Sequence, residues 1–156
     1  MDAYKTAVIL LVEDDLGDQK LTKQSLKGDK IGNELRMVST AEEAFEYLEK
    51  GKRNEPECPL PDLILLDLNM PGMGGKDFLK QLKTDPDLDS IPVVILTTSD
   101  SDKDVLESFQ LQASGYIQKP ANLEGFRQAM NDLTDYWFVI CRRVQQGSSI
   151  VRSVAS

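Results

Sequence analysis

The sequence of 156 residues contains no histidine. This absence excludes catalysis by Ser-His-Asp or Cys-His sets, zinc sites with histidine ligands, and a role as a phosphohistidine donor. The two cysteines, Cys58 and Cys141, are too few for a disulfide framework or a cysteine metal site. No apolar run approaches the ~20 residues of a membrane span, and the N-terminus lacks the layout of a signal peptide. We therefore expect a cytoplasmic protein that does not enter membranes.

Basic residues are in the minority. The chain has 18 lysines and arginines against 26 aspartates and glutamates, so its formal net charge is −8. The basic clusters are short, at Lys50–Arg53 and Arg142-Arg143. Because nucleic acids bind to basic faces, we expect no nucleic-acid partner. The chemistry that remains is that of carboxylates, hydroxyls and lysine, with or without a divalent cation.

Three short segments, residues 8–12, 63–66 and 93–96, are apolar at almost every position. Such runs are typical of strands buried on both faces of a parallel sheet. Two mixed runs, residues 35–38 and 115–118, fit edge strands. With helical patterns between the runs, the sequence predicts an α/β fold: a five-stranded parallel sheet, doubly wound and flavodoxin-like, in the order 2-1-3-4-5, with five flanking helices.

The helical patterns differ in strength. The clearest begins at Ala41, with apolar residues at i, i+3, i+4 and i+7, and Thr40 and Glu43 form a capping box at its start. Shorter apolar stripes start at Phe78 and, after the cap residue Ser101, at residue 105. A thin stripe of leucines predicts the first helix, and its members are Leu16, Leu21 and Leu26. Segment 51–61 is predicted to be a loop because it contains three prolines and no periodicity.

Polar residues follow the predicted strands. The first strand ends in Glu13-Asp14-Asp15, the third in Asp67-Leu68-Asn69, the fourth in Thr97-Thr98 and the fifth in Lys119-Pro120. The carboxyl ends of parallel strands meet at one edge of a sheet, so these side chains are expected to converge. Crowded carboxylates repel one another, and a hard divalent cation such as Mg²⁺ relieves the repulsion. A lysine and a hydroxyl beside such a site suit phosphoryl transfer.

These residues resemble the receiver domain of two-component response regulators. The resemblance rests on Glu13-Asp14, on Asp67 to Gly75, on Thr97, and on Gly115-Tyr116-Ile117-Gln118-Lys119-Pro120. It covers residues 6–133, and four such elements in order are a specific signal. The stretch Leu96-Thr97-Thr98-Ser99, the long loop before Pro61 and the helix around Trp137 further resemble the small regulators that pair with phytochrome-type histidine kinases.

The resemblance implies a metal site and a phosphoacceptor. Asp67 is the implied phosphoacceptor and Asp14 the implied direct ligand of Mg²⁺. Glu13 would help through water, and Asn69 would offer its backbone carbonyl. The residues themselves leave one alternative open, since Asp15 follows Asp14 and the acidic pair could be Asp14-Asp15. The spacing to the first helix favours Glu13-Asp14.

The resemblance also implies a switch. Thr97 would bond a phosphoryl oxygen, and Lys119 would pair with the phosphate and with Asp67. Tyr116 takes the place of the family's aromatic switch residue. Thr98 stands where the family often has alanine and would crowd the inward position of Tyr116. From the residues alone, the alternative for Tyr116 is a partly buried tyrosine of an edge strand.

The last predicted helix is longer than the sheet requires. Its apolar residues recur at spacings of three and four from Leu123 to Val144. That is ~22 residues or ~33 Å, against ~17–20 Å for strands of five or six residues. Four residues lack evident cover and predict a homodimer or partner interface: Trp137, Phe138, Ile140 and Val144. The alternative is a helix that curls over its own core. We expect a domain of residues 1–145 and a disordered tail of residues 146–156.

The resemblance implies a single-domain response regulator rather than an enzyme. A sensor histidine kinase, of phytochrome type by the narrower resemblance, would donate the phosphoryl group, and a downstream protein would read it by contact. Two other classes fit less well. A phosphohydrolase would want a second acid two residues after its nucleophile, where this chain has Asn69. A flavin mononucleotide site would want a loop rich in glycine and hydroxyls in place of Glu13-Asp14-Asp15.

Overall fold

The chain forms one parallel sheet of five strands in the order β2-β1-β3-β4-β5. A computed structural model describes residues 7–26, 33–68, 74–97 and 113–118, together with residues 124–125, 127–129 and 131–132. The strands are β1 (Ala7–Val12), β2 (Asn33–Val38), β3 (Leu63–Asp67), β4 (Val93–Thr97) and β5 (Gly115–Gln118). The predicted fold class and strand order are confirmed, and the two mixed runs are the edge strands β2 and β5.

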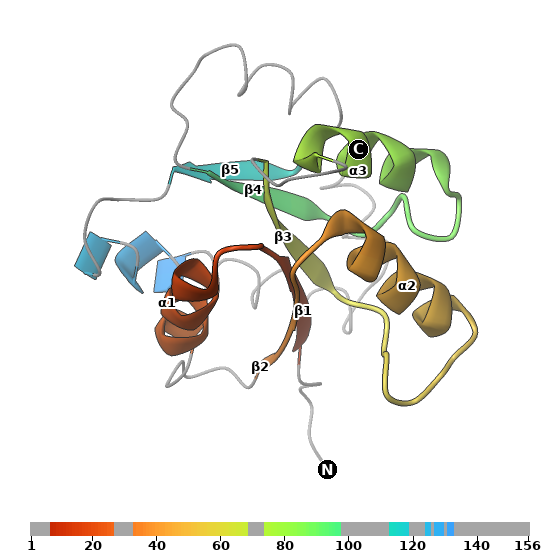
Figure 1. Cartoon of the computed structure of the whole chain (residues 1–156), viewed down its shortest axis with the longest axis horizontal. Helices are drawn as coiled ribbons and strands as arrows, with labels where there is room; N and C mark the ends of the chain where they lie inside the picture. The colour runs from red at the N-terminus through yellow and green to blue at the C-terminus, as the bar shows by residue number, and fades with distance from the viewer. Residues whose placement is uncertain are drawn as a thin grey trace, which may run out of the picture.

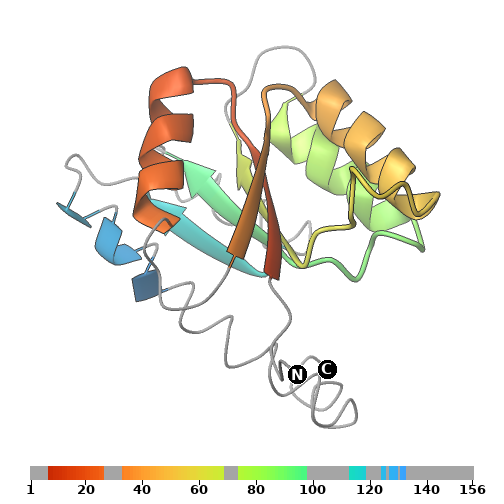
Figure 2. The same cartoon turned by 90° about the horizontal axis from the view of Figure 1, so that it is seen from below.

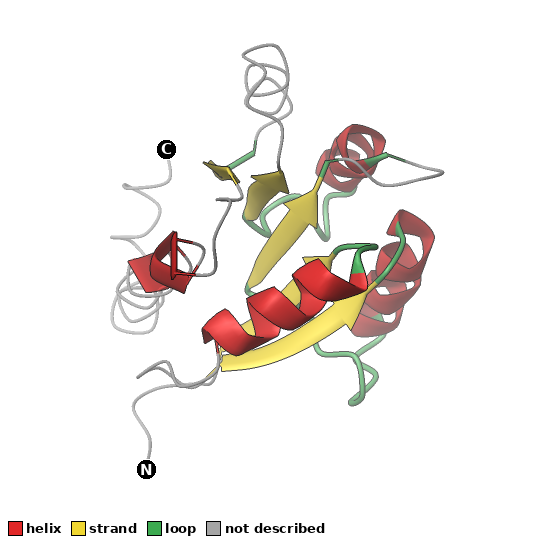
Figure 3. Cartoon of the chain, turned by 60° about the vertical axis from the view of Figure 1, so that its left-hand side comes forward, coloured by secondary structure: helices red, strands yellow, loops and turns green. Residues whose placement is uncertain are grey.

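Helices cover both faces of the sheet (Figure 1 and Figure 2). Helix α1 (Leu16–Leu26) lies on one face, and α2 (Ala41–Lys52) and α3 (Gly75–Thr84) lie on the other. The strands form a layer between them (Figure 3). The helical residues 124–125, 127–129 and 131–132 lie beside α1 in both views. The predicted fourth helix, the rest of the last helix and the predicted tail lie outside the described residues.

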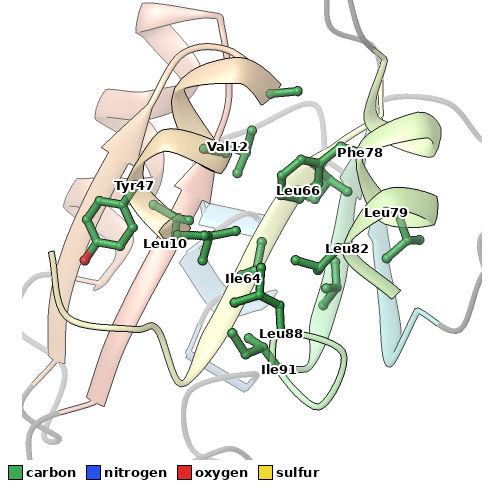
Figure 4. Packing of buried hydrophobic residues seen from close by; sticks show 14 of the residues in the cluster. Leu10, Val12, Tyr47, Ile64, Leu66, Phe78, Leu79, Leu82, Leu88 and Ile91 are labelled. Carbon is green, nitrogen blue, oxygen red and sulfur yellow. The ribbon is translucent and has the colours of Figure 1, made fainter. Parts of the chain in front are cut away.

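Buried strands divide the core into two clusters. In β1, Leu10 and Val12 face α2 and α3, whereas Ile9 and Leu11 face α1. The cluster on the α2–α3 side of the sheet is the larger of the two. Figure 4 shows Phe78 and Leu82 of α3 beside Ile64 and Leu66 of β3. Every residue of β3 is buried. This explains why the central strands are apolar at every position and do not alternate with polar residues.

Helix α1 buries a polar face, and the prediction of a leucine stripe is wrong at Leu16, which is 70% exposed. Leu26 is buried and Leu21 packs against the cluster on the α1 side of the sheet. The other buried residues of the helix are Gln19, Thr22 and Ser25. The hydroxyls of Thr22 and Ser25 donate to carbonyls one turn back, which satisfies them without outside partners. Leu16 is exposed because the helix begins there, beyond the end of β1.

Helix α2 begins with a modified capping box. The hydroxyl of Thr40 accepts a hydrogen bond from the N–H of Glu43 at 3.0 Å, as predicted. The Glu43 carboxylate accepts from the N–H of Ser39 at 2.7 Å and so reaches one residue further back than a standard box does. Two N–H groups at the start of the helix are thereby satisfied.

The loop predicted for residues 51–61 begins later than expected, because α2 continues through Lys52. Helix α2 ends in a left-handed cap, because Asn54 has φ 61°. The N–H of Asn54 donates to the carbonyl of Gly51, and the N–H of Glu55 donates to the carbonyl of Lys50. Gly51 is buried under the loop, where an added Cβ would lie 2.7 Å from Leu60.

In the part of the chain that the structure describes, no helix is both long and apolar enough to cross a bilayer.

Candidate functional site

Strand register brings acidic residues together at the carboxyl edge of the sheet. Val12 of β1 pairs with Leu66 of β3, so the next residues, Glu13 and Asp67, lie level with each other. Carboxylate oxygens of Glu13, Asp14 and Asp67 all lie within 4.8 Å of one another. Glu13 is 1% exposed and Asp67 5% exposed, whereas Asp14 is open to solvent. We call these three residues the acidic site.

Glu13 is held by hydrogen bonds from several directions. Its N–H donates to the carbonyl of Val38 at the end of β2, at 3.0 Å. Its own carbonyl accepts from the side-chain amide of Gln19 at 2.6 Å. Its carboxylate accepts from the N–H of Asp15 at 3.2 Å. The loop that carries Glu13 and Asp14 is therefore tied to β2 and to α1.

Asp15 has a separate role. Its carboxylate accepts hydrogen bonds from the N–H groups of Gly17 at 2.7 Å and Asp18 at 3.1 Å. Asp15 thus caps the N-terminus of α1, where a short acceptor and a negative charge are both favourable. It stands outside the group of close carboxylates, so the geometry favours Glu13-Asp14 over Asp14-Asp15 as the acidic pair.

The first turn of α3 packs against the backbone of Asp67. The N–H of Gly75 donates to the carbonyl of Leu68 at 3.2 Å. A Cβ on Gly75 would lie 2.5 Å from the Asp67 carbonyl oxygen and 2.6 Å from the Leu68 Cα, closer than real Cβ atoms approach. Only glycine allows α3 to approach this closely, so that its first turn packs directly on the backbone of Asp67.

The donor set of the acidic site fits a hard divalent cation. Three carboxylates this close repel one another, and burial of Glu13 and Asp67 strengthens the repulsion. Oxygen ligands of this kind suit Mg²⁺ and Mn²⁺ rather than softer metals. Asp14, at the open side, leaves room for water ligands, which Mg²⁺ usually keeps.

The structure places some of the other predicted site residues on the same edge. Thr97 is the last residue of β4, one position beyond Leu96, which pairs with Asp67. Tyr116 lies in β5, paired with Ile95. For Thr97 and Tyr116 the structure describes the backbone only. Outside the described residues lie Asn69, Thr98, Lys119, Trp137, Phe138, Ile140 and Val144.

Two polar residues beside the acidic site were missed from the sequence. Gln19 contacts Glu13 directly, and Ser39 accepts a second hydrogen bond from the Gln19 amide at 3.2 Å. A signal existed: Gln19, Thr22 and Leu26 follow one another at i, i+3 and i+7, the spacing of a buried helix face. It was hidden because two of the three residues are polar.

Comparisons with known proteins agree with this geometry. Residues 9–131 match the response regulator receiver domain family. The chain belongs to this family. It is 38% identical over 130 residues to the response regulator Rcp1 of Synechocystis sp., covering 83% of this chain and 88% of Rcp1.

Solved structures of such regulators are similar along most of their length. The Mn²⁺-bound form of Rcp1 matches with a TM-score of 0.76 and 38% identity, covering 85% of this chain and 94% of that one. The phosphorylated cyanobacterial phytochrome response regulator RcpA matches with a TM-score of 0.78 and 36% identity, with the same coverage.

The receiver fold and the family define the class of activity. The chain is a two-component response regulator, a signalling protein that takes up a phosphoryl group on an aspartate. Receiver domains bind a divalent cation at an acidic pocket, and the acidic site has the close carboxylate oxygens that such a cation takes as ligands. The family assignment decides against a flavin site and favours signalling over a phosphohydrolase.

Proposed function

We propose that Asp67 is the phosphoacceptor of this receiver domain. The observation that carries the proposal is the meeting of three carboxylates from the ends of β1 and β3 within 4.8 Å. Of these three, Asp67 ends the central strand β3 and is backed by the first turn of α3. A nucleophile so supported is held in one orientation toward the incoming phosphoryl group.

The cofactor of the reaction is Mg²⁺. Asp14 would bind it directly, Glu13 would help through water, and Asp67 and the backbone carbonyl of Asn69 would complete the protein ligands. The hard oxygen donors of the acidic site and the Mn²⁺ bound in the relative Rcp1 support this choice. When bound, the ion neutralises charge on the phosphoryl oxygens.

The phosphoryl group comes from a phosphohistidine of a sensor kinase, and the 156 residues of this sequence contain no histidine that could supply it. A carboxylate oxygen of Asp67 forms a bond to phosphorus. The bond from phosphorus to the donor imidazole nitrogen breaks, and its electron pair returns to the ring. Thr97 and Lys119 hold the phosphoryl oxygens during this exchange.

The donor is a sensor histidine kinase of phytochrome type. The support is the similarity to RcpA, named as a cyanobacterial phytochrome response regulator, over 85% of this chain. The protein acts in the cytoplasm as a single-domain regulator and catalyses no turnover beyond its own phosphotransfer and slow dephosphorylation.

The phosphorylated state is read by protein contact. Thr97 moves toward the phosphate, and Tyr116 follows inward past Thr98. The receiver domain extends through residues 1–145, followed by a tail of residues 146–156. A homodimer forms through the end of the last helix, by way of Trp137, Phe138, Ile140 and Val144. Truncation after Thr134 tests this interface, and an unchanged mass in solution with partner binding intact would contradict it.

One experiment tests the acceptor. The protein is incubated with Mg²⁺ and acetyl phosphate, and intact mass and acyl-phosphate lability are measured. We expect one labile phosphoryl group that is absent in Asp67→Asn and without Mg²⁺, and present in the control Asp15→Asn, whose asparagine still caps α1. Continuous donor turnover with no adduct would favour a phosphohydrolase. A labile adduct on Asp67→Asn would move the acceptor elsewhere.

A further inference from the structure

Gln19 is a buried amide on a helix face where an apolar side chain is usual. It is 9% exposed. Its Nε2 atom donates to the carbonyl oxygen of Glu13 at 2.6 Å and to the hydroxyl of Ser39 at 3.2 Å. Burying an amide is unfavourable unless it is hydrogen-bonded, so these two contacts explain how Gln19 is tolerated there. They also connect α1 to two loops at the carboxyl edge of the sheet.

The hydrogen bonds continue beyond Ser39 into the start of α2. The N–H of Ser39 donates to the Glu43 carboxylate at 2.7 Å, and the N–H of Glu43 donates to Thr40 at 3.0 Å. Ser39 is therefore fixed by the cap of α2. Because Gln19 bonds both Ser39 and the Glu13 carbonyl, the loop that follows β1 is tied to this fixed position.

The bond to Glu13 acts on the peptide that joins the two acids of that loop. The peptide group is planar, so holding the Glu13 carbonyl also sets the direction of the Asp14 N–H and Cα. The Glu13 N–H is already held by Val38. With Gln19 in place both ends of Glu13 are fixed, and the exposed Asp14 starts from a defined backbone position.

We propose that Gln19 is a positioning residue for the divalent cation, holding Glu13 and Asp14 in the geometry that binds it. The inference rests on the proposed function, because it takes the acidic site as the cation site. Gln19 does not reach the cation itself. Its effect passes through the Glu13 carbonyl, in the way that outer partners orient the ligands of other metal sites.

The test compares Gln19→Met with a matched control, Thr22→Val. Methionine keeps the length of the side chain and removes the donor. Thr22 is also buried, one turn along the same face, and among the described residues its hydroxyl bonds its own helix, at the Asp18 carbonyl. Mn²⁺ affinity is measured by calorimetry on the full chain. Amide hydrogen exchange of residues 13–16 and thermal stability are measured without metal.

We expect Gln19→Met to raise the Mn²⁺ dissociation constant about tenfold and to speed exchange at residues 13–16. Thr22→Val should leave both unchanged, whatever it does to thermal stability. Ser39→Ala, which leaves Gln19 one partner, should raise the constant about threefold and keeps the test open if Gln19→Met does not fold.

Equal affinities in wild type, Gln19→Met and Ser39→Ala would overturn the inference, as would an equal loss in Thr22→Val. Failure of the wild type itself to bind Mn²⁺ would instead overturn the cation site, and the inference with it. The two failures are thus distinguished by the wild-type titration.

Discussion

Gly75 lies against Asp67 so closely that a single added carbon would overlap the Asp67 backbone. The virtual Cβ is 2.5 Å from the Asp67 carbonyl oxygen. We expect Gly75→Ala to lower the free energy of unfolding by about 2 kcal/mol, because α3 or the end of β3 must shift. Gly74→Ala is the control, since a Cβ there meets nothing within 4 Å, and its loss should be limited to the poorer N-cap that alanine makes for α3, about 1 kcal/mol or less. Urea unfolding of both variants measures the difference, and equal losses would show that the contact is unimportant.

Asp14→Asn is expected to stabilise the protein without metal and to weaken its response to metal. Removing one of three close charges relieves about 1 kcal/mol of repulsion at low salt. In the wild type, Mg²⁺ at a hundred times its dissociation constant should add about 3 kcal/mol to stability, and this gain should largely vanish in the variant. Thermal unfolding with and without Mg²⁺ measures both effects.

Asp15→Asn is the control for that experiment, because asparagine caps a helix as well as aspartate does. Asp15 lies outside the acidic site, so its variant should keep the full stabilisation by Mg²⁺. A variant that loses the metal response would instead place Asp15 among the ligands and revive the Asp14-Asp15 pair.

An ion pair joins the C-terminal ends of α2 and α3 and predicts a pH dependence. The Lys52 ammonium lies 2.9 Å from the Asp85 carboxylate. Its hydrogen bond, helped by the N–H of Asp87, lowers the pKa of Asp85 below the ordinary value. The contribution to stability is therefore present above the ordinary pKa of about 4. It is lost as the pH falls through the lower pKa of the folded state.

Lys52→Gln tests this dependence. At neutral pH the variant should be slightly less stable than the wild type, and the difference should disappear below about pH 4, as Asp85 becomes protonated in both. Lys50→Gln, at an exposed lysine of the same helix end, should show no such pH-dependent difference. Chemical denaturation at a series of pH values gives the comparison. A difference that persists unchanged into acid would mean that Lys52 acts by packing.

The left-handed cap of α2 predicts an order of stabilities at residue 54. Asn54 has φ 61°, a conformation that costs about 1–2 kcal/mol for an ordinary L-residue, little for glycine and an intermediate amount for asparagine. We expect stability to rank Asn54→Gly at or above wild type and Asn54→Ala about 1 kcal/mol below it. Thermal unfolding of the three proteins measures the order. Alanine equal to glycine would contradict the left-handed assignment.

Much of the fold could be predicted because its signals are local. The apolar runs of β1, β3 and β4 mark strands buried on both faces, and the mixed runs mark the edges. Thr40 and Glu43, three positions apart, predicted the start of α2 through their capping contact. The stripe of α1 misled because a polar helix face can be buried when each group finds a partner, which composition does not reveal.

The candidate site also has features that the sequence predicts and features that it does not. The acids at the strand ends could be named from the sequence, since the carboxyl ends of parallel strands share an edge. For Asp15, the spacing to the first helix already favoured a place outside the acidic pair. Only the direction of its side chain shows that it caps α1. The contact between Gln19 and Ser39 could not be predicted from local spacing, since the two residues are twenty positions apart in the sequence.

The class of this protein can be deduced from the order of its strands and helices, the absence of histidine, and the acids at the ends of β1 and β3. These features depend on residue type and short spacings. The folded structure adds that Asp15 caps α1, that Glu13, Asp14 and Asp67 lie within 4.8 Å of one another, and that a Cβ on Gly75 would overlap the Asp67 backbone. Those outcomes depend on strand register and on the approach of α3 to β3, which are distances between segments far apart in the chain.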